Sequence, residues 1–143
     1  MSKKLLLCVI VVIFLAALLA IGILHPKAKH GKAITEVNLY QKQADTICAM
    51  LNNAFKLYQH GHPKKAYGLA ENTYWEVYDN VLEIKYRAYV TPAYIFAVEG
   101  KFHEVSASMN KPVTAKHSTV ILQQIKALCT EVNTEANYLI KHR

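Results

Sequence analysis

The sequence has few of the residues that interrupt helices and none of the motifs that mark common enzymes. It contains 5 glycines and 4 prolines in 143 residues, and no segment alternates apolar and polar residues as a half-buried strand would. No Gly-x-Ser-x-Gly nucleophile elbow is present, and no recognisable motif places a histidine beside a serine or cysteine. The absence of a Cys-x-x-Cys pair argues against a redox catalyst. These absences predict a helical protein that is not an enzyme.

Acidic residues are absent from the first 35 positions. The whole chain has 10 Asp and Glu against 17 Lys and Arg, which gives a formal charge of +7. From residue 33 onward, 12 basic residues accompany all 10 acids, so this part is nearly neutral. The other five basic residues flank a single apolar run; they are Lys3, Lys4, Lys27, Lys29 and Lys32. The excess charge therefore belongs to the ends of that run, and a nucleic-acid partner loses its main support.

The apolar run covers residues 5–24, twenty positions without a charge. At about 1.5 Å per residue, a helix of this length spans the roughly 30 Å hydrocarbon core of a bilayer. We predict an uncleaved signal-anchor over residues 1–24, and a cleavable signal peptide is the alternative, because Ala20 and Gly22 are small enough for a signal peptidase. The four residues before the apolar run are easily left in the cytoplasm while the rest of the chain is exported. We therefore expect a single pass through the cell inner membrane, with the C-terminal domain in the periplasm.

Apolar residues in the remainder recur three and four positions apart, as in amphipathic helices. Thr35 is the expected cap of the first helix, and Gly61 its expected end. Pro63 and Pro92 fit the first turns of the next two helices, and the last begins near Thr114. The apolar positions are Val37, Tyr40, Ala44, Ile47, Leu51, Ala54 and Tyr58, then Ala66, Ala70, Tyr74, Val77, Val81, Ile84 and Ala88, then Ala93, Phe96, Ala97, Phe102 and Val105, and finally Ile121, Ile125, Leu128, Val132, Ala136 and Leu139.

Four such helices joined by short loops predict an all-α, up-down-up-down four-helix bundle. We place this bundle domain at residues 35–143, on a basic stalk at residues 25–34 that follows the membrane anchor.

Two of the three cysteines lie in the bundle, because Cys8 falls within the anchor. Cys48 lies on the first bundle helix and Cys129 on the last. Antiparallel neighbours would place the two at similar heights, so we predict a disulfide in an oxidising compartment. Two buried free thiols are the alternative, because cysteine is often a plain core residue.

Candidate metal ligands lie on the second and third bundle helices. Glu76, Asp79 and Glu83 are spaced i, i+3 and i+7, and Glu99 and His103 are spaced i and i+4. Because the turn near Val90 and Thr91 is about equally far from both groups, antiparallel packing would bring them to matching levels.

Carboxylate and histidine side chains on facing helices are the usual ligands of metal sites in bundles. We therefore take Asp79, Glu83, Glu99 and His103 as candidate ligands. The alternative is a solvated face on which Glu83 pairs with Arg87 at i, i+4.

The stretch from Tyr58 to Met109 resembles the extracytoplasmic helical domain of bacterial high-affinity iron permeases. It covers about 50 of the 143 residues. The matching residues are Tyr58, Gly61, Lys65 and Ala66 at a helix end, Tyr74, Trp75, Tyr78, Asp79, Leu82 and Glu83 on an aromatic and acidic helix, and Glu99 and Phe102 in a Glu-x-x-Phe helix.

The resemblance implies acids near an iron-delivery surface, which map here onto Asp79, Glu83 and Glu99. The chain departs from the family in lacking an Arg-Glu-x-x-Glu permease helix and the arginine that usually follows Glu-x-x-Phe. We therefore expect a detached domain that binds or delivers a cation, with iron the implied ion and another membrane or periplasmic protein the implied partner. The alternative is a structural or assembly subunit of an envelope complex without a metal site.

Overall fold

The computed structural model describes residues 29–142, and side chains from Leu39 to His142. Contacts group Ala33–Arg143 into one compact unit. The predicted membrane anchor at residues 5–24 lies outside the described residues. Among the residues that are described, no helix combines the length and the apolar character needed to cross a membrane.

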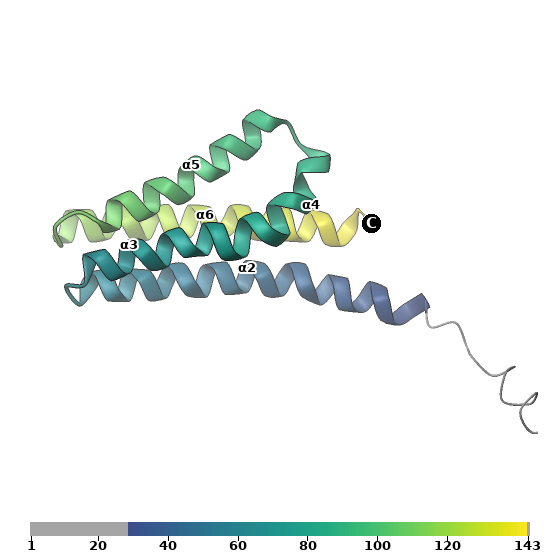
Figure 1. The fold of residues 1–143 in the computed structure, drawn as a ribbon, viewed down its shortest axis with the longest axis horizontal. Coiled ribbons are helices and arrows are strands. Elements are labelled where there is room, and N and C mark those ends of the chain that lie inside the picture. The colour runs from purple at the N-terminus through teal and green to yellow at the C-terminus, as the bar shows by residue number, and fades with distance from the viewer. Residues whose placement is uncertain (1–28, 143) are drawn as a thin grey trace, which may run out of the picture. The chain divides into compact units, whose positions relative to one another are not determined.

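Residues 29–142 form four helical segments without a strand, which confirms the predicted all-α bundle. Consecutive segments run in opposite directions in Figure 1, so the topology is up-down-up-down. The second segment is continuous but changes its helical type three times. In chain order the elements are α2 (Lys29–Gln59), the four parts α3 (Pro63–Asn72), η1 (Thr73–Glu83), α4 (Ile84–Tyr86) and η2 (Arg87–Tyr89), then α5 (Pro92–Met109) and α6 (Ala115–Lys141).

Most of the helix ends lie where the sequence predicts them. Gly61 has φ of +78°, a conformation that glycine adopts at little cost, and it turns the chain between α2 and α3. The Thr91 side chain accepts a hydrogen bond from the amide of Tyr94, and Thr114 accepts one from the amide of His117. These two threonines are N-caps that satisfy amides left free at the start of α5 and α6.

The start of the first helix differs from the prediction, because α2 begins at Lys29 and Thr35 lies inside it. Between Lys29 and Thr35 only Gly31 disfavours a helix, and no proline follows Pro26 until Pro63. A good capping residue alone therefore did not stop the helix from extending toward the N-terminus.

The first and last helices bury the apolar residues that their spacing predicts. Every predicted core position of α6 is buried, and so is every predicted position of α2 whose side chain is described. Regular α-helical geometry keeps residues three and four apart on one face, so the sequence pattern translates directly into burial here.

The second segment buries the predicted residues Ala66, Ala70 and Tyr74, and beyond Tyr74 it departs from the predicted row. Its buried apolar residues are Ala66, Ala70, Tyr74, Tyr78, Leu82 and Tyr86, which recur every four positions. Predicted core residue Ile84 is instead 55% exposed. The cause is η1, an eleven-residue π-helix, in which each amide bonds to a carbonyl five residues back. This widens each turn, so a spacing of four stays on one face and Glu83 turns into the interior.

α5 also departs from the prediction at its N-terminal half, where Ile95 and Val98 are buried and Phe96 is 67% exposed. This helix packs mainly on α3 and α6. Figure 1 shows that α5 lies close to them near its C-terminal end and diverges toward Pro92. The N-terminal half of α5 is therefore less enclosed than the rest of the bundle.

Candidate functional site

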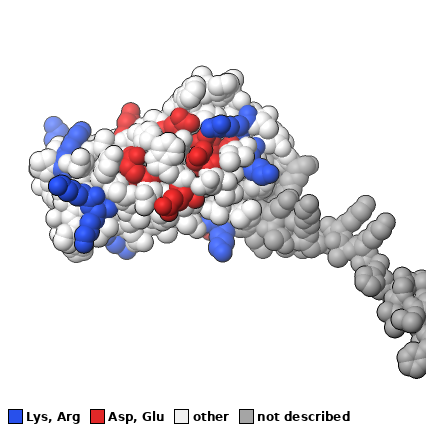
Figure 2. All heavy atoms as spheres, viewed as in Figure 1, with Lys and Arg blue, Asp and Glu red and all other residues white. Residues whose placement is uncertain are grey.

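Acidic side chains are concentrated on one side of the bundle. Figure 2 shows them gathered in the middle of the visible face, with basic side chains mainly toward its two ends. Residues 71–104 contain six of the ten acids but three basic residues, so η1 and α5 carry a net negative charge within a nearly neutral domain. The six acids are Glu71, Glu76, Asp79, Glu83, Glu99 and Glu104. We call η1 and α5 together the acidic side.

Glu83 is the most enclosed acid of this side. Its side chain is 0% exposed, and its Oε2 atom has no hydrogen-bond partner among the described residues. Its Oε1 atom accepts a hydrogen bond from Arg87 Nε at 2.9 Å and a second from Arg87 Nη2. Burying a carboxylate oxygen without a hydrogen-bond partner costs free energy of folding. Glu83 carries that cost at its Oε2 atom.

Arg87 joins two of the candidate ligands. Its Nη2 atom contacts Glu83 and also lies 3.9 Å from Glu99 Oε1. The Arg87 side chain is 55% exposed, whereas Glu99 is 22% exposed. A guanidinium ion therefore lies between two carboxylates on η1 and α5, and it reaches them from the solvent side.

Charge interactions link these groups to Asp79. Burial raises the pKa of the Glu83 carboxyl; hydrogen bonds and charge attraction from Arg87 oppose that rise, and repulsion from Asp79 and Glu99 adds to it. The guanidinium pKa of Arg87 is raised in turn by Glu83, through their hydrogen bonds and their charges. Tyr74 completes the group, because burial and the nearby charges of Glu83, Glu99 and Asp79 raise its pKa.

The structure thus brings three of the four predicted ligands, Asp79, Glu83 and Glu99, into one electrostatic group around Arg87. Within the described part of the chain, no three His, Cys, Asp or Glu side chains are grouped so that they could hold one metal ion. The carboxylates are therefore gathered but are not converged on a single point, and the guanidinium is the cation that they share.

His103 has different partners from the other three. Its Nδ1 atom lies 3.2 Å from Glu71 Oε1, and its ring centre lies 5.3 Å from that of Tyr74. The pKa of Glu71 is lowered: burial acts to raise it, but the hydrogen bonds with Ser106 and His103 outweigh burial. Tyr74 is the residue that contacts both His103 and the carboxylate group.

A second buried acid, Glu135 on α6, is absent from the predicted site. Its side chain is 0% exposed. Its Oε1 atom accepts hydrogen bonds from Tyr78 at 3.3 Å and from Tyr94 at 3.1 Å, while Oε2 has no partner among the described residues. The sequence does contain a signal, because Glu135 lies three residues after Val132 and four before Leu139, at a core position of the α6 pattern.

A small pocket adjoins Arg87 and Glu99 where η2 turns into α5. Its volume is about 240 Å³, and its apolar lining consists of Val90, Pro92, Ile95 and Phe96. Arg87 and Glu99 also line it, so apolar side chains lie beside the shared guanidinium.

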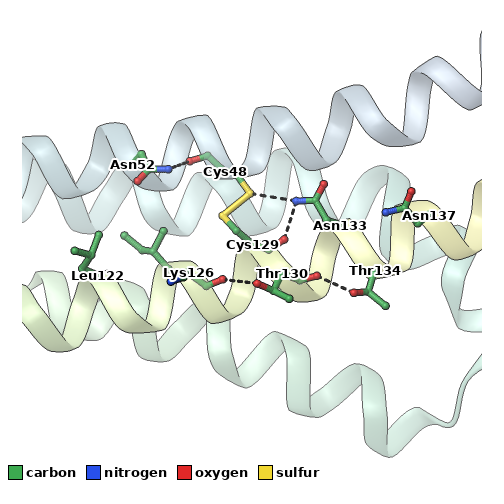
Figure 3. Close-up of a pocket in the computed structure, with 10 residues that line it drawn as sticks. Cys48, Asn52, Leu122, Lys126, Cys129, Thr130, Asn133, Thr134 and Asn137 are labelled. Carbon is green, nitrogen blue, oxygen red and sulfur yellow. Dashed lines mark hydrogen bonds between the residues drawn. A yellow bond between two sulfur atoms is a disulfide. The ribbon is translucent and has the colours of Figure 1, made fainter.

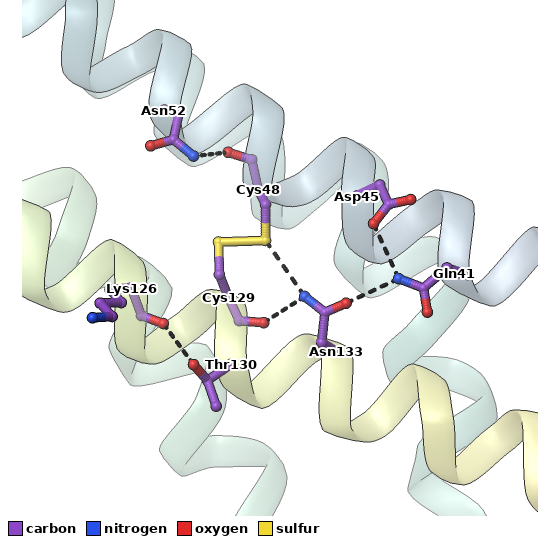
Figure 4. The surroundings of a disulfide bond; sticks show 8 residues. All are labelled: Gln41, Asp45, Cys48, Asn52, Lys126, Cys129, Thr130 and Asn133. Atoms are coloured by element: carbon purple, nitrogen blue, oxygen red, sulfur yellow. Dashed lines mark hydrogen bonds between the residues drawn. A yellow bond between two sulfur atoms is a disulfide. The ribbon is translucent and has the colours of Figure 1, made fainter.

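The opposite side of the bundle contains the disulfide. The structure bonds Cys48 of α2 to Cys129 of α6, and their Cα atoms are 5.5 Å apart, within the usual range for a disulfide. Figure 4 shows Asn133 beside it, donating a hydrogen bond to the carbonyl of Cys129 at 2.8 Å and accepting one from Gln41 at 3.0 Å. The disulfide and these amides tie α2 to α6, which we call the disulfide side.

An open groove of about 750 Å³ runs along the disulfide side between α2 and α6. Figure 3 shows the two sulfur atoms in this groove, with one amide side chain, Asn52, on α2 and amide and hydroxyl side chains along α6. Its polar lining residues are Asn52, Lys126, Thr130, Asn133, Thr134 and Asn137, among which Lys126 alone is charged. The groove thus lacks the paired carboxylates that distinguish the acidic side.

Comparisons with family models, with curated proteins and with solved structures gave no significant match to this chain.

Proposed function

We propose that this chain is a membrane-anchored, extracytoplasmic helical bundle that binds a metal cation and passes it to or from another membrane protein. Iron is the ion that the resemblance to the permease domain implies. The observation that carries the proposal is Glu83, a fully buried carboxylate with a partnerless oxygen beside the acids Asp79 and Glu99. Such a group favours a cation more strongly than any acid on a solvated surface does.

Arg87 balances the carboxylates of the proposed site. Its guanidinium neutralises Glu83 and reaches Glu99, so the carboxylates tolerate one another. Because the side chain is more than half exposed, it can rotate into solvent without breaking core contacts. A cation that entered would replace the guanidinium, and the freed carboxylates would then converge on it.

The donor set suits a hard or borderline cation. Carboxylate oxygens are the preferred ligands of such ions, and bundle proteins hold iron with glutamates from facing helices. Tyr74 adds a phenol whose pKa is raised by burial and by the nearby Glu83 and Glu99. His103 pairs with Glu71 and contacts Tyr74, so we assign it an outer position rather than a direct bond to the ion.

The disulfide supports an extracytoplasmic location, because such bonds persist in oxidising compartments and are rare in the cytoplasm. The apolar run at residues 5–24 would hold the bundle at the inner membrane, with the bundle in the periplasm. A carrier held there lies within reach of a membrane transporter, which is the partner class that the resemblance implies.

Calorimetric titration of the full-length chain in detergent tests the proposal. The probes are ferrous iron under anaerobic conditions, zinc and copper. We expect wild-type protein to bind iron and the double variant Glu83→Gln, Glu99→Gln to bind it at least tenfold more weakly. The matched control is Glu76→Gln, Glu104→Gln, which removes the same charge from the same two helices at exposed positions. This control should bind like wild type.

Two results would contradict the metal site: no heat of binding with any of the three ions, or equal weakening in the test and control variants. Equal weakening would mean that the net negative charge of the acidic side attracts cations without a defined site.

A second candidate function, a structural or assembly subunit without a metal site, is favoured by exposed aromatic residues. Trp75 is 54% exposed and Phe96 is 67% exposed, and aromatic side chains are enriched in protein interfaces. If this function is the correct one, the variant Trp75→Ser, Phe96→Ser will lose its partners in complexes purified from membranes while the Glu83 and Glu99 variant keeps them.

A further inference from the structure

Glu135 is a buried acid that the proposed cation site does not use. It sits among core residues of α6, and the partners of its Oε1 atom come from two other elements, Tyr78 on η1 and Tyr94 on α5. Its Oε2 atom has no partner in the described part of the chain. Burying an ionised carboxylate costs far more than burying a neutral one, so this environment favours a proton on Oε2.

The groups around Glu135 are neutral or negative. Burial raises its pKa to about 7; the hydrogen bonds from Tyr78 and Tyr94 oppose that rise, and repulsion from Glu131 and Glu83 adds to it. Glu135 in turn contributes to the raised pKa of Tyr86 on α4. The cations Arg87 and Lys101 are paired with other acids, Glu83 and Glu131 respectively. On α2, the exposed Asp45 pairs with Gln41 rather than with Glu135.

We propose that Glu135 is an internal proton-binding site that controls how firmly α5 packs against η1 and α6. When Oε2 carries the proton, the carboxyl is neutral, both phenols still donate to Oε1, and the three elements stay closed. When the proton leaves, the buried charge is relieved by water, and water reaches it only if a neighbouring element moves away.

The N-terminal half of α5 is the element that the structure leaves freest to move. Figure 1 shows that this half diverges from α6, and the 240 Å³ pocket lies beside its residues Ile95 and Phe96. Tyr94, the α5 donor to Glu135, belongs to the same half. Movement there would expose Glu135 without disturbing the disulfide between α2 and α6. None of these steps requires a metal ion, so the inference stands or falls separately from the proposed function.

The direction of the pH effect follows from linkage. The carboxyl pKa is about 7 in the closed bundle, and it would approach the ordinary value of about 4.3 once water reaches the group. The proton therefore favours the closed form, and opening becomes easier as the pH rises through this interval. Between pH 6 and pH 8 the population of the open form should increase roughly tenfold.

Hydrogen exchange of the full-length protein in detergent, measured without metal at pH 6 and pH 8 and corrected for the intrinsic exchange rate, tests this proposal. We expect the protection of amides between Pro92 and Phe102 to fall roughly tenfold in wild type. Glu135→Gln keeps the size and an acceptor oxygen but has no proton to lose, so its protection should be the same at both values. Glu104→Gln, at an exposed position of α5, should behave like wild type.

A second variant covers the case in which Glu135→Gln fails to fold. Tyr94→Phe keeps the acid but removes one donor to it, which disfavours the ionised form and raises the carboxyl pKa in the closed bundle. The loss of protection between pH 6 and pH 8 should therefore be larger than in wild type. The proposal is overturned if wild-type protection does not depend on pH, or if the Gln variant shows the same dependence as wild type.

Discussion

Different contacts hold the helices of the acidic side and the helices of the disulfide side. α2 and α6 are joined by a covalent bond and by neutral amides around Asn133. η1 buries the carboxylate of Glu83, which is balanced by one half-exposed arginine that also reaches Glu99 of α5, and phenols of η1 and α5 donate to Glu135 of α6. Buried charges reduce stability unless they are fully paired, and such compromises are typical of functional sites. In the function that we propose, the disulfide side stabilises the fold while the acidic side is available for binding.

The largest expected effect is on the disulfide side. Replacing both cysteines, Cys48→Ser with Cys129→Ser, removes a link across a sequence separation of 81 residues. In the chain-entropy model a loop of this size contributes about 4 kcal/mol to the free energy of unfolding. Urea unfolding should show that loss, while cation affinity stays unchanged. A loss below about 1 kcal/mol, with or without reductant, would contradict the stabilising role that we assign to this side.

A smaller effect is expected on the acidic side from Arg87→Ala. This change leaves the buried Glu83 without its cation and should lower the free energy of unfolding by about 1 to 3 kcal/mol at pH 8. Because burial already raises the Glu83 pKa, the carboxyl of the variant would take up a proton more readily and the loss should shrink toward pH 5. Urea unfolding at both pH values checks this, and a loss that does not change with pH would show that Glu83 is not the group affected.

The smallest effects concern the helix caps, where the two sides should not differ. Thr91 caps α5 on the acidic side and Thr114 caps α6 on the disulfide side, each through one hydrogen bond to an amide. Thr91→Ala and Thr114→Ala should each cost about 1 kcal/mol, as N-cap losses usually do. Thermal unfolding of the two variants compares them, and a markedly larger cost for Thr114 would mean that the disulfide side depends on local helix stability.

Sequence reasoning succeeded where the helices are regular. The spacing of α2 and α6 predicted their buried residues and the pairing of Cys48 with Cys129, because α-helical geometry fixes which residues share a face. In the second segment it was right for Ala66, Ala70 and Tyr74 and wrong beyond them, where the π-helix η1 buries Tyr78 and Leu82 and the predicted Ile84 is exposed. No residue type or short motif predicts an eleven-residue π-helix. The sequence does show apolar residues every four positions from Ala66 to Tyr86, which is the spacing that is buried.

The candidate site was partly predictable for the same reason. Asp79, Glu83 and Glu99 lie together because η1 and α5 are antiparallel about the turn at Val90. The sequence predicts this, because the acids on both helices are about equally far from that turn. The second contact of Arg87, with Glu99, depends on how far apart the two helices pack, and the sequence does not specify that distance. The apolar pattern of α6 predicts Ala136 in the core and does not by itself predict that the neighbouring acid Glu135 is buried as well.

The claim that carries this account is that a cation binds where the Arg87 guanidinium now lies. The most direct test is an anaerobic ferrous iron titration of Arg87→Ala beside wild type, in the same detergent and at pH 7.5. Removing the competing guanidinium should tighten iron binding at least threefold, and the gain should disappear when Glu83→Gln is added. Unchanged or weaker binding in Arg87→Ala would contradict the account, because Arg87 would then not occupy the site that the ion requires.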